Sequence, residues 1–295
     1  MGTATVDASG NAPKEANGIP TLKLNDGNEI PLIGYGLGTA RYKRSNFDVL
    51  DENIINATLT AIKNGYYHLD GAEAYGNEAE LGEAIARSGV DRSKLFVTTK
   101  TSCRAGESIE TAFSRSLAKL KLDYVDLYLI HSPFWAKSPA ELQAKWAEVE
   151  ALKDSGRARS IGVSNFLPEH LDAVLQTARH PPVINQIEYH PYLQHDASDL
   201  LGYLRSKGIA ISAYSPPDRH HQGPRRARRR RLRAPRYQGI VALTTSAKED
   251  RLKGWKQRLP LFKLTPEEVK EIAERGNEKH FRGYWTKHFK EDDRR

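Results

Sequence analysis

Short apolar runs alternate along the chain with longer stretches in which apolar residues recur every three or four positions. A short, continuously apolar run is typical of a strand that is buried on both faces. Such runs lie at Ile33–Leu37, Tyr67–Asp70, Leu95–Lys100, Val125–His131, Ser160–Val163, Val183–Tyr189, Ile209–Tyr214 and Ile240–Thr244. The longer stretches predict amphipathic helices, at Glu52–Asn64, Glu78–Ser88, Ser108–Leu120, Pro139–Ser155, Pro168–Ala178 and Ser198–Lys207.

This alternation predicts an α/β fold, a (β/α)8 TIM barrel, because eight strands and their helices fit into about 250 residues. A doubly wound open sheet also alternates strands and helices, but it carries a glycine-rich phosphate loop after its first strand. Residues 34–38 match such a loop only in part, and no helix pattern follows them directly. An Asp26-Gly27 turn between two short extended runs adds an N-terminal β-hairpin.

The same pattern predicts a single domain with two irregular segments. Residues 1–19 are small and polar, and we expect them to form a flexible tail ahead of one barrel domain at 20–295. After the seventh run the barrel requires a helix, but residues 218–237 have almost no apolar side chains. An arginine-rich segment therefore replaces the helix 7 region.

Composition narrows the class of protein. With 295 residues, 39% of them hydrophobic, the chain can bury a large core, which excludes a disordered chain. No stretch approaches the roughly 20 apolar residues of a membrane helix, and residues 1–17 lack the apolar core of a signal peptide. The single cysteine, Cys103, excludes an internal disulfide, so we expect a reducing, cytoplasmic location.

The net charge of +8 suggests a nucleic-acid binder, but its distribution does not. Nine arginines and one aspartate between Asp218 and Tyr237 carry the whole excess, and the remaining chain is close to neutral. The basic character is therefore a local feature.

Four polar residues follow the predicted strands on the side where a barrel carries its chemistry. The second strand ends at Asp70, with Tyr75 five residues later, and the third and fourth end at Lys100 and His131. A lysine close to a phenol is expected to lower the pKa of the phenol, and an aspartate holds the lysine. The set suits carbonyl reduction, in which hydride reaches carbon while the phenol protonates oxygen. Each residue alone could instead cap a loop or pack in the barrel.

Six motifs give the chain a family resemblance. Residues 69–78 (LDGAEAYGNE) resemble the first signature of the aldo-keto reductase family, and residues 281–285 (FRGYW) resemble tails in its fungal branch. Residues 97–100, 129–133, 161–166 and 186–191 are similar to the family's later motifs, in the same order. The resemblance runs from about Leu32 to Tyr214 and resumes at Ile240.

The resemblance implies an NADPH-dependent carbonyl reductase. Tyr75 matches the proton donor, Lys100 and Asp70 the pair that tunes it, and His131 the histidine that orients the substrate. The matched cofactor-binding positions are Ser164, Asn165 and Gln186 for the carboxamide, Tyr214 for stacking, Thr39 and Ser215 along the cofactor, and Ser246 and Arg251 near the 2′-phosphate.

The sequence departs from the family at three places. Ala40 stands where many members carry a tryptophan, which favours a bulkier or branched ketone. Thr245 stands where many place a lysine on the 2′-phosphate, a task that Lys248 can take. The arginine tract is the third departure: it is a basic loop near the phosphates, a nucleic-acid or localisation patch at Arg228–Arg231, or a peptide from a misread frame. We favour the misread frame.

We therefore expect a monomeric, cytoplasmic oxidoreductase that acts on a small-molecule carbonyl substrate with NADPH. We expect no metal, because no cluster of histidine, cysteine and carboxylate has ligand spacing, and no membrane partner. One alternative is a cofactor-binding regulatory barrel that turns over slowly. The other is nucleic-acid binding through the arginine tract, which the neutral remainder argues against.

Overall fold

Eight parallel strands close into a barrel in the computed structural model, which describes residues 15–16, 18–38, 41–195, 198–214, 239–258 and 265–295. The strand order around the barrel is β10-β11-β4-β5-β6-β7-β8-β9. These strands are β4 (Ile33–Gly36), β5 (His68–Asp70), β6 (Phe96–Thr101), β7 (Val125–Ile130), β8 (Ala158–Ser164), β9 (Ile184–Glu188), β10 (Ala210–Tyr214) and β11 (Val241–Thr244). The predicted TIM barrel and its eight strands are confirmed.

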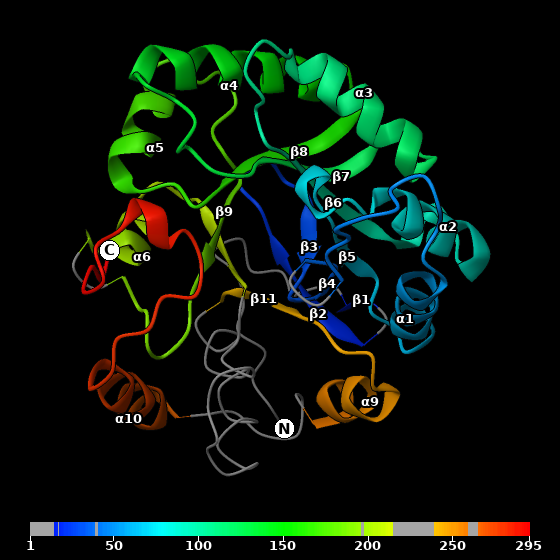
Figure 1. Ribbon diagram of the computed structural model, residues 1–295. Helices are drawn as coiled ribbons and strands as arrows, with labels where there is room; N and C mark the ends of the chain where they lie inside the picture. Colours follow the sequence, from blue (N-terminus) through cyan, green and yellow to red (C-terminus); the bar gives the residue numbers. More distant parts are fainter. Residues whose placement is uncertain (1–14, 17, 39–40, 196–197, 215–238, 259–264) are drawn as a thin grey trace.

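Helices surround the strands as an outer ring (Figure 1). They are α1 (Glu52–Lys63), α2 (Glu78–Ser88), α3 (Ile109–Leu120), α4 (Pro139–Asp154), α5 (Pro168–Leu175), α6 (Leu200–Ser206), α9 (Glu249–Arg258) and α10 (Pro266–Asn277). The six predicted helices are confirmed, with ends that differ by a few residues. Short 3-10 turns occur at η1 (Glu73–Tyr75), η2 (Arg92–Lys94) and η4 (Thr286–His288).

The helix starts follow from local sequence. The side chains of Ser108 and Ser138 accept the backbone N–H of the residue three positions later, at the beginning of α3 and α4. Asp51 accepts the N–H of Asn53 at the start of α1. Each cap satisfies a donor that the first helical turn leaves unpaired, so the boundaries of the ring are set by the sequence itself.

A small antiparallel sheet precedes the barrel. β2 (Ile19–Lys23) and β3 (Glu29–Pro31) form the predicted hairpin, with Gly27 in a left-handed conformation at the turn. β1 (Glu15–Ala16) pairs with β2, which begins at Ile19, so the prediction of a flexible tail over residues 1–19 is wrong for these three residues. Backbone hydrogen bonds between β1 and β2 hold them in place.

Three predictions concern parts of the chain outside the described residues. The first is the flexible tail, of which residues 1–14 and 17 lie there. The second is the arginine-rich segment at 218–237; the strands on either side of it pair in register, with Ser212 opposite Val241. The third concerns the predicted site residues Thr39 and Ser215, together with Ala40. In the described parts of the chain, no helix is long and apolar enough to cross a membrane.

Candidate active site

The candidate site lies where the carboxyl ends of β5 to β10 meet. Tyr75 is carried by η1, directly after β5, and two backbone hydrogen bonds hold it: its N–H donates to Ala72 and its carbonyl accepts from Lys43. Gly38 packs against it: a Cβ there would lie 3.1 Å from Cζ of the Tyr75 ring, so a larger residue at this position would press on the phenol.

Lys100 is the centre of the buried polar set. Its Nζ donates to Asp70 Oδ1 at 2.7 Å and to the carbonyl of Gly71 at 2.7 Å, and it reaches Tyr75 Oη at 3.4 Å. The lysine side chain is fully buried and that of Asp70 almost so. Two charges removed from water in this way persist because each is the other's close partner.

The protonation of Tyr75 differs from the expectation. Burial raises the pKa of its phenol well above the ordinary value, and the negative charge of Asp70 raises it further. The Lys100 ammonium, 3.4 Å from the hydroxyl, favours the phenolate, but burial and the charge of Asp70 outweigh it. The expected lowering of this pKa is therefore wrong for the protein alone, and the phenol keeps its proton at neutral pH.

His131 completes the group at the end of β7. Its ring stands edge-on to Tyr75, with ring centroids 5.5 Å apart and an interplanar angle of 79°. Burial lowers the pKa of this imidazole to about 3, and the Lys100 ammonium adds to the effect. His131 is therefore neutral and can donate or accept a hydrogen bond without carrying charge.

Amide and hydroxyl side chains of β8, β9 and β10 lie beside this group. They belong to the rim of the barrel, by which we mean the edge formed by the carboxyl ends of its strands. Gln186 Nε2 donates to Asp70 Oδ2 at 2.8 Å, which joins these side chains to the lysine pair. Asn165 Nδ2 donates to the His131 carbonyl at 2.9 Å and to Ser164 Oγ at 2.9 Å, and its Oδ1 accepts from Tyr214 at 2.6 Å. The structure thus brings Ser164, Asn165, Gln186 and Tyr214 into one hydrogen-bond network beside the group formed by Asp70, Tyr75, Lys100 and His131.

The other two predicted residues lie past β11. Ser246 is buried, and its hydroxyl accepts the N–H of Lys248 at 3.0 Å. Arg251 follows in the first turn of α9, and both Lys248 and Arg251 are exposed. Neither basic side chain forms an ion pair within the described residues.

Sequence reasoning missed the part of the site that the C-terminal segment supplies. Trp285 Nε1 donates to the Tyr214 hydroxyl at 3.2 Å, and its ring lies 6.1 Å from that of His131. Phe134 follows β7, and the centroid of its ring lies 5.3 Å from that of Trp285. In the sequence, this segment shows only a resemblance to known C-terminal tails, and no periodic pattern there indicates that it returns to the rim.

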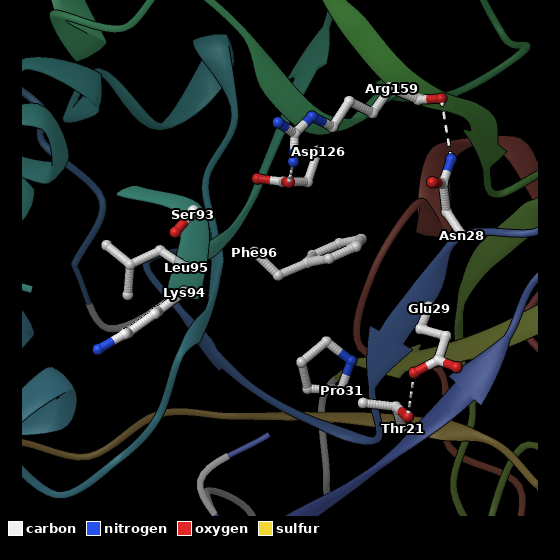
Figure 2. A pocket seen from close by; sticks show the side chains of 10 residues that line it. All are labelled: Thr21, Asn28, Glu29, Pro31, Ser93, Lys94, Leu95, Phe96, Asp126 and Arg159. Carbon is white, nitrogen blue, oxygen red and sulfur yellow. Dashed lines mark hydrogen bonds and ion pairs between the residues drawn. The ribbon is translucent and has the colours of Figure 1, made fainter. Parts of the chain in front are cut away.

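A cavity of about 300 Å³ lies at the opposite end of the barrel (Figure 2). Phe96, Asp126 and Arg159, which line it, stand at the first or second residue of β6, β7 and β8. Asp126 is already paired with Arg92 at 2.7 Å and with Arg159 at 3.4 Å. No group of three histidine, cysteine or carboxylate side chains is placed to hold a metal ion in the described ranges.

The chain as a whole is similar to known proteins of one family. The model described as "Aldo/keto reductase family" matches residues 35–279. The NAD/NADP-dependent indole-3-acetaldehyde reductase of Schizosaccharomyces pombe is 34% identical over 283 residues, which cover 90% of this chain and 98% of the relative. The NADPH-dependent alpha-keto amide reductase of Saccharomyces cerevisiae is 34% identical over 297 residues, 90% of this chain and 93% of the relative. A crystal structure of a Bombyx mori aldo-keto reductase in complex with NADP superposes with a TM-score of 0.74 at 34% identity, covering 87% of this chain and 92% of that one.

Proposed function

The chain belongs to the aldo/keto reductase family, and we propose that Tyr75 delivers the proton when the protein reduces an aldehyde or ketone to an alcohol. The enzyme is an NADP-dependent carbonyl reductase, in line with the activities of its fungal relatives. The observation that carries the role of Tyr75 is the contact of its hydroxyl with Lys100, beside the edge-on ring of His131.

The residues at the rim fit a nicotinamide cofactor. A carboxamide needs a hydrogen-bond donor and acceptors in one plane, and the side chains of Ser164, Asn165 and Gln186 supply both kinds of group within one network. We assign these three residues to the carboxamide and Tyr214 to the ring. A bound nicotinamide supplies the hydride that reduces the carbonyl carbon.

We assign the phosphate end of the cofactor to Ser246, Lys248 and Arg251. The two exposed cations follow the buried serine at the start of α9 and have no ion-pair partner among the described residues. A guanidinium suits a phosphate because its planar donors match two phosphate oxygens. Lys248 thus takes the place that Thr245 cannot fill, and we expect a preference for NADPH.

The chain's own residues then perform the proton transfer. The phenol of Tyr75 is protonated because burial raises its pKa, so it can give its proton to the carbonyl oxygen. The phenolate that remains gains the nearby Lys100 ammonium as its counter-charge, while Asp70 holds that ammonium in place. Neutral His131 orients the carbonyl oxygen by a hydrogen bond.

Tyr75→Phe tests this assignment because it removes the hydroxyl and keeps the ring. We expect turnover of an aromatic aldehyde to fall below about a tenth of the wild-type rate, while the dissociation constant for NADPH changes by less than about twofold. Tyr203→Phe is the matched control, since its hydroxyl contacts Asp172 on the outer ring. Turnover of Tyr75→Phe above a tenth of wild type would overturn the role of Tyr75.

A further inference from the structure

Glu188, the last residue of β9, is a buried carboxylate with no part in the proton transfer. Its side chain is 2% exposed. Oε1 accepts the backbone N–H of Gly283 at 2.8 Å, and Oε2 accepts that of Tyr284 at 3.0 Å. His190 Nε2 lies 3.1 Å from Oε1 and must carry the proton of that ring, because a carboxylate only accepts.

These contacts join two parts of the chain that are 95 residues apart. A carboxylate taken out of water is tolerated only where charge-assisted hydrogen bonds replace its hydration. Among the described residues, two of the groups that donate to this carboxylate are main-chain N–H groups of the C-terminal segment. Gly283 also allows the approach, because a Cβ there would lie 3.1 Å from Glu188 Oε1.

The residue after these two donors has a strained backbone. Trp285 has φ of 59°, in the left-handed region that a bulky side chain rarely adopts. Such a conformation is unfavourable for a bulky residue and persists only where the surroundings hold it. The hydrogen bonds of Glu188 to the two preceding residues hold Trp285 in this conformation from one side.

From the other side, the Trp285 side chain contacts the candidate site. Its Nε1 donates to Tyr214, and its ring lies against His131 and Phe134. Beyond it, His288 stacks on Phe134 at 4.1 Å with an interplanar angle of 9°. Residues 281–289, which we call the C-terminal strap, thus cross the rim with Trp285 turned toward His131.

We propose that Glu188 is a positioning residue that fastens the C-terminal strap to the end of β9 and so sets the wall that Trp285 presents to the substrate. The kinetic part of the proposal rests on the proposed function; the fastening itself does not. The substrate class that such a wall favours is an aromatic or otherwise flat, apolar carbonyl compound, because indole and phenyl rings stack on one another.

Hydrogen exchange of the full-length protein tests the fastening without any activity measurement. We expect amide exchange in residues 281–289 to rise from wild type to Glu188→Gln, which keeps one acceptor, and again to Glu188→Ala, which keeps none. Glu150→Gln is the matched control: Glu150 is also a buried carboxylate that accepts a backbone N–H, from His180, but it lies on α4 in the outer ring. Exchange in the strap of Glu188→Gln equal to that of wild type and of the control would overturn the proposal.

A double-mutant cycle with Trp285→Ala tests whether Glu188 acts through Trp285. For an aromatic aldehyde, we expect Glu188→Gln to raise KM about tenfold with a smaller change in kcat, as for the loss of a charged hydrogen bond that supports binding. In the Trp285→Ala background, the same substitution should leave KM unchanged. Additive effects on KM would contradict action through Trp285. If the wild-type protein is inactive but strap exchange rises in the Glu188 variants as expected, the proposed function is contradicted and the fastening by Glu188 is not.

Gly283→Ala approaches the same contact from the strap. Its Cβ would press on Glu188 Oε1, so we expect strap exchange and KM to change in the same direction as in Glu188→Gln and by less. Because Gly283→Ala removes no buried charge, we expect it to fold and to serve as the test if the Glu188 variants do not fold. A faster-exchanging strap with an unchanged KM would overturn the link between the two.

Discussion

At the scale of single residues, the site depends on a buried pair of charges that is neutral as a unit. Lys100 is fully buried, and in the described part of the chain its ammonium donates to Asp70, to the Gly71 carbonyl and to Tyr75. Removing one member of such a pair leaves the other charge buried without compensation, which is far more costly than removing both. Stability and catalysis should therefore respond differently to single and double substitutions.

We expect Lys100→Met to lower the free energy of unfolding by about 3 kcal/mol and to reduce kcat by about 100-fold or more. In the double variant Asp70→Asn with Lys100→Met, most of the stability should return because no charge is left unpaired, while kcat stays low. Urea denaturation and steady-state kinetics on the same preparations measure both quantities. Recovery of kcat in the double variant would contradict the role of Lys100 as the counter-charge of Tyr75.

The residues of this group could be predicted from the sequence, and their protonation could not. Asp70, Lys100 and His131 end consecutive strands, so the barrel geometry alone brings them together with Tyr75. The pKa of Tyr75 depends on how deeply protein surrounds the ring and on how completely Asp70 offsets Lys100. Neither quantity follows from residue spacing.

At the scale of elements, close backbone contacts between helices restrict the outer ring. Gly82 of α2 faces the end of α3, where a Cβ would lie 2.4 Å from the backbone oxygen of Leu120. That distance leaves no room for any side chain, so α2 and α3 can pack this closely only because residue 82 is glycine. Gly254 of α9, in contrast, has open space around it.

We therefore expect opposite effects from the same substitution in two helices. Gly82→Ala should destabilise the protein by about 2 kcal/mol, because the two helices must move apart. Gly254→Ala should stabilise it by about 0.5 kcal/mol, because alanine restricts the unfolded chain and favours helix. Thermal unfolding of both variants measures the difference, and a Gly82→Ala protein as stable as Gly254→Ala would contradict the packing described for α2 and α3.

Sequence reasoning missed α9, α10 and the C-terminal strap, and only α10 carries a signal in its sequence that could have been used. α9 is mostly charged, with Leu252 and Trp255 as its large apolar residues, so its pattern resembles a solvated loop. α10 carried a usable signal: Thr265 and Glu268 form a capping box ahead of it, and Val269, Ile272 and Ala273 share helical spacing. The C-terminal strap has neither periodicity nor caps, and its position depends on Glu188, which is 95 residues away.

At the scale of the whole molecule, the proposed reaction requires a closed barrel that brings hydride and proton donors to one carbonyl group. The described strands form such a ring, with Ala242 of β11 opposite Ile33 of β4 as well as Ser212 of β10 opposite Val241. The most direct measurement is mass spectrometry of the product formed from an aromatic aldehyde and NADPH deuterated at both C4 positions of the nicotinamide. We expect an alcohol with one deuterium on the former carbonyl carbon from the wild-type protein, and almost none from Tyr75→Phe. An unlabelled alcohol, or no alcohol from a wild-type protein that binds NADPH, would contradict the proposed reaction.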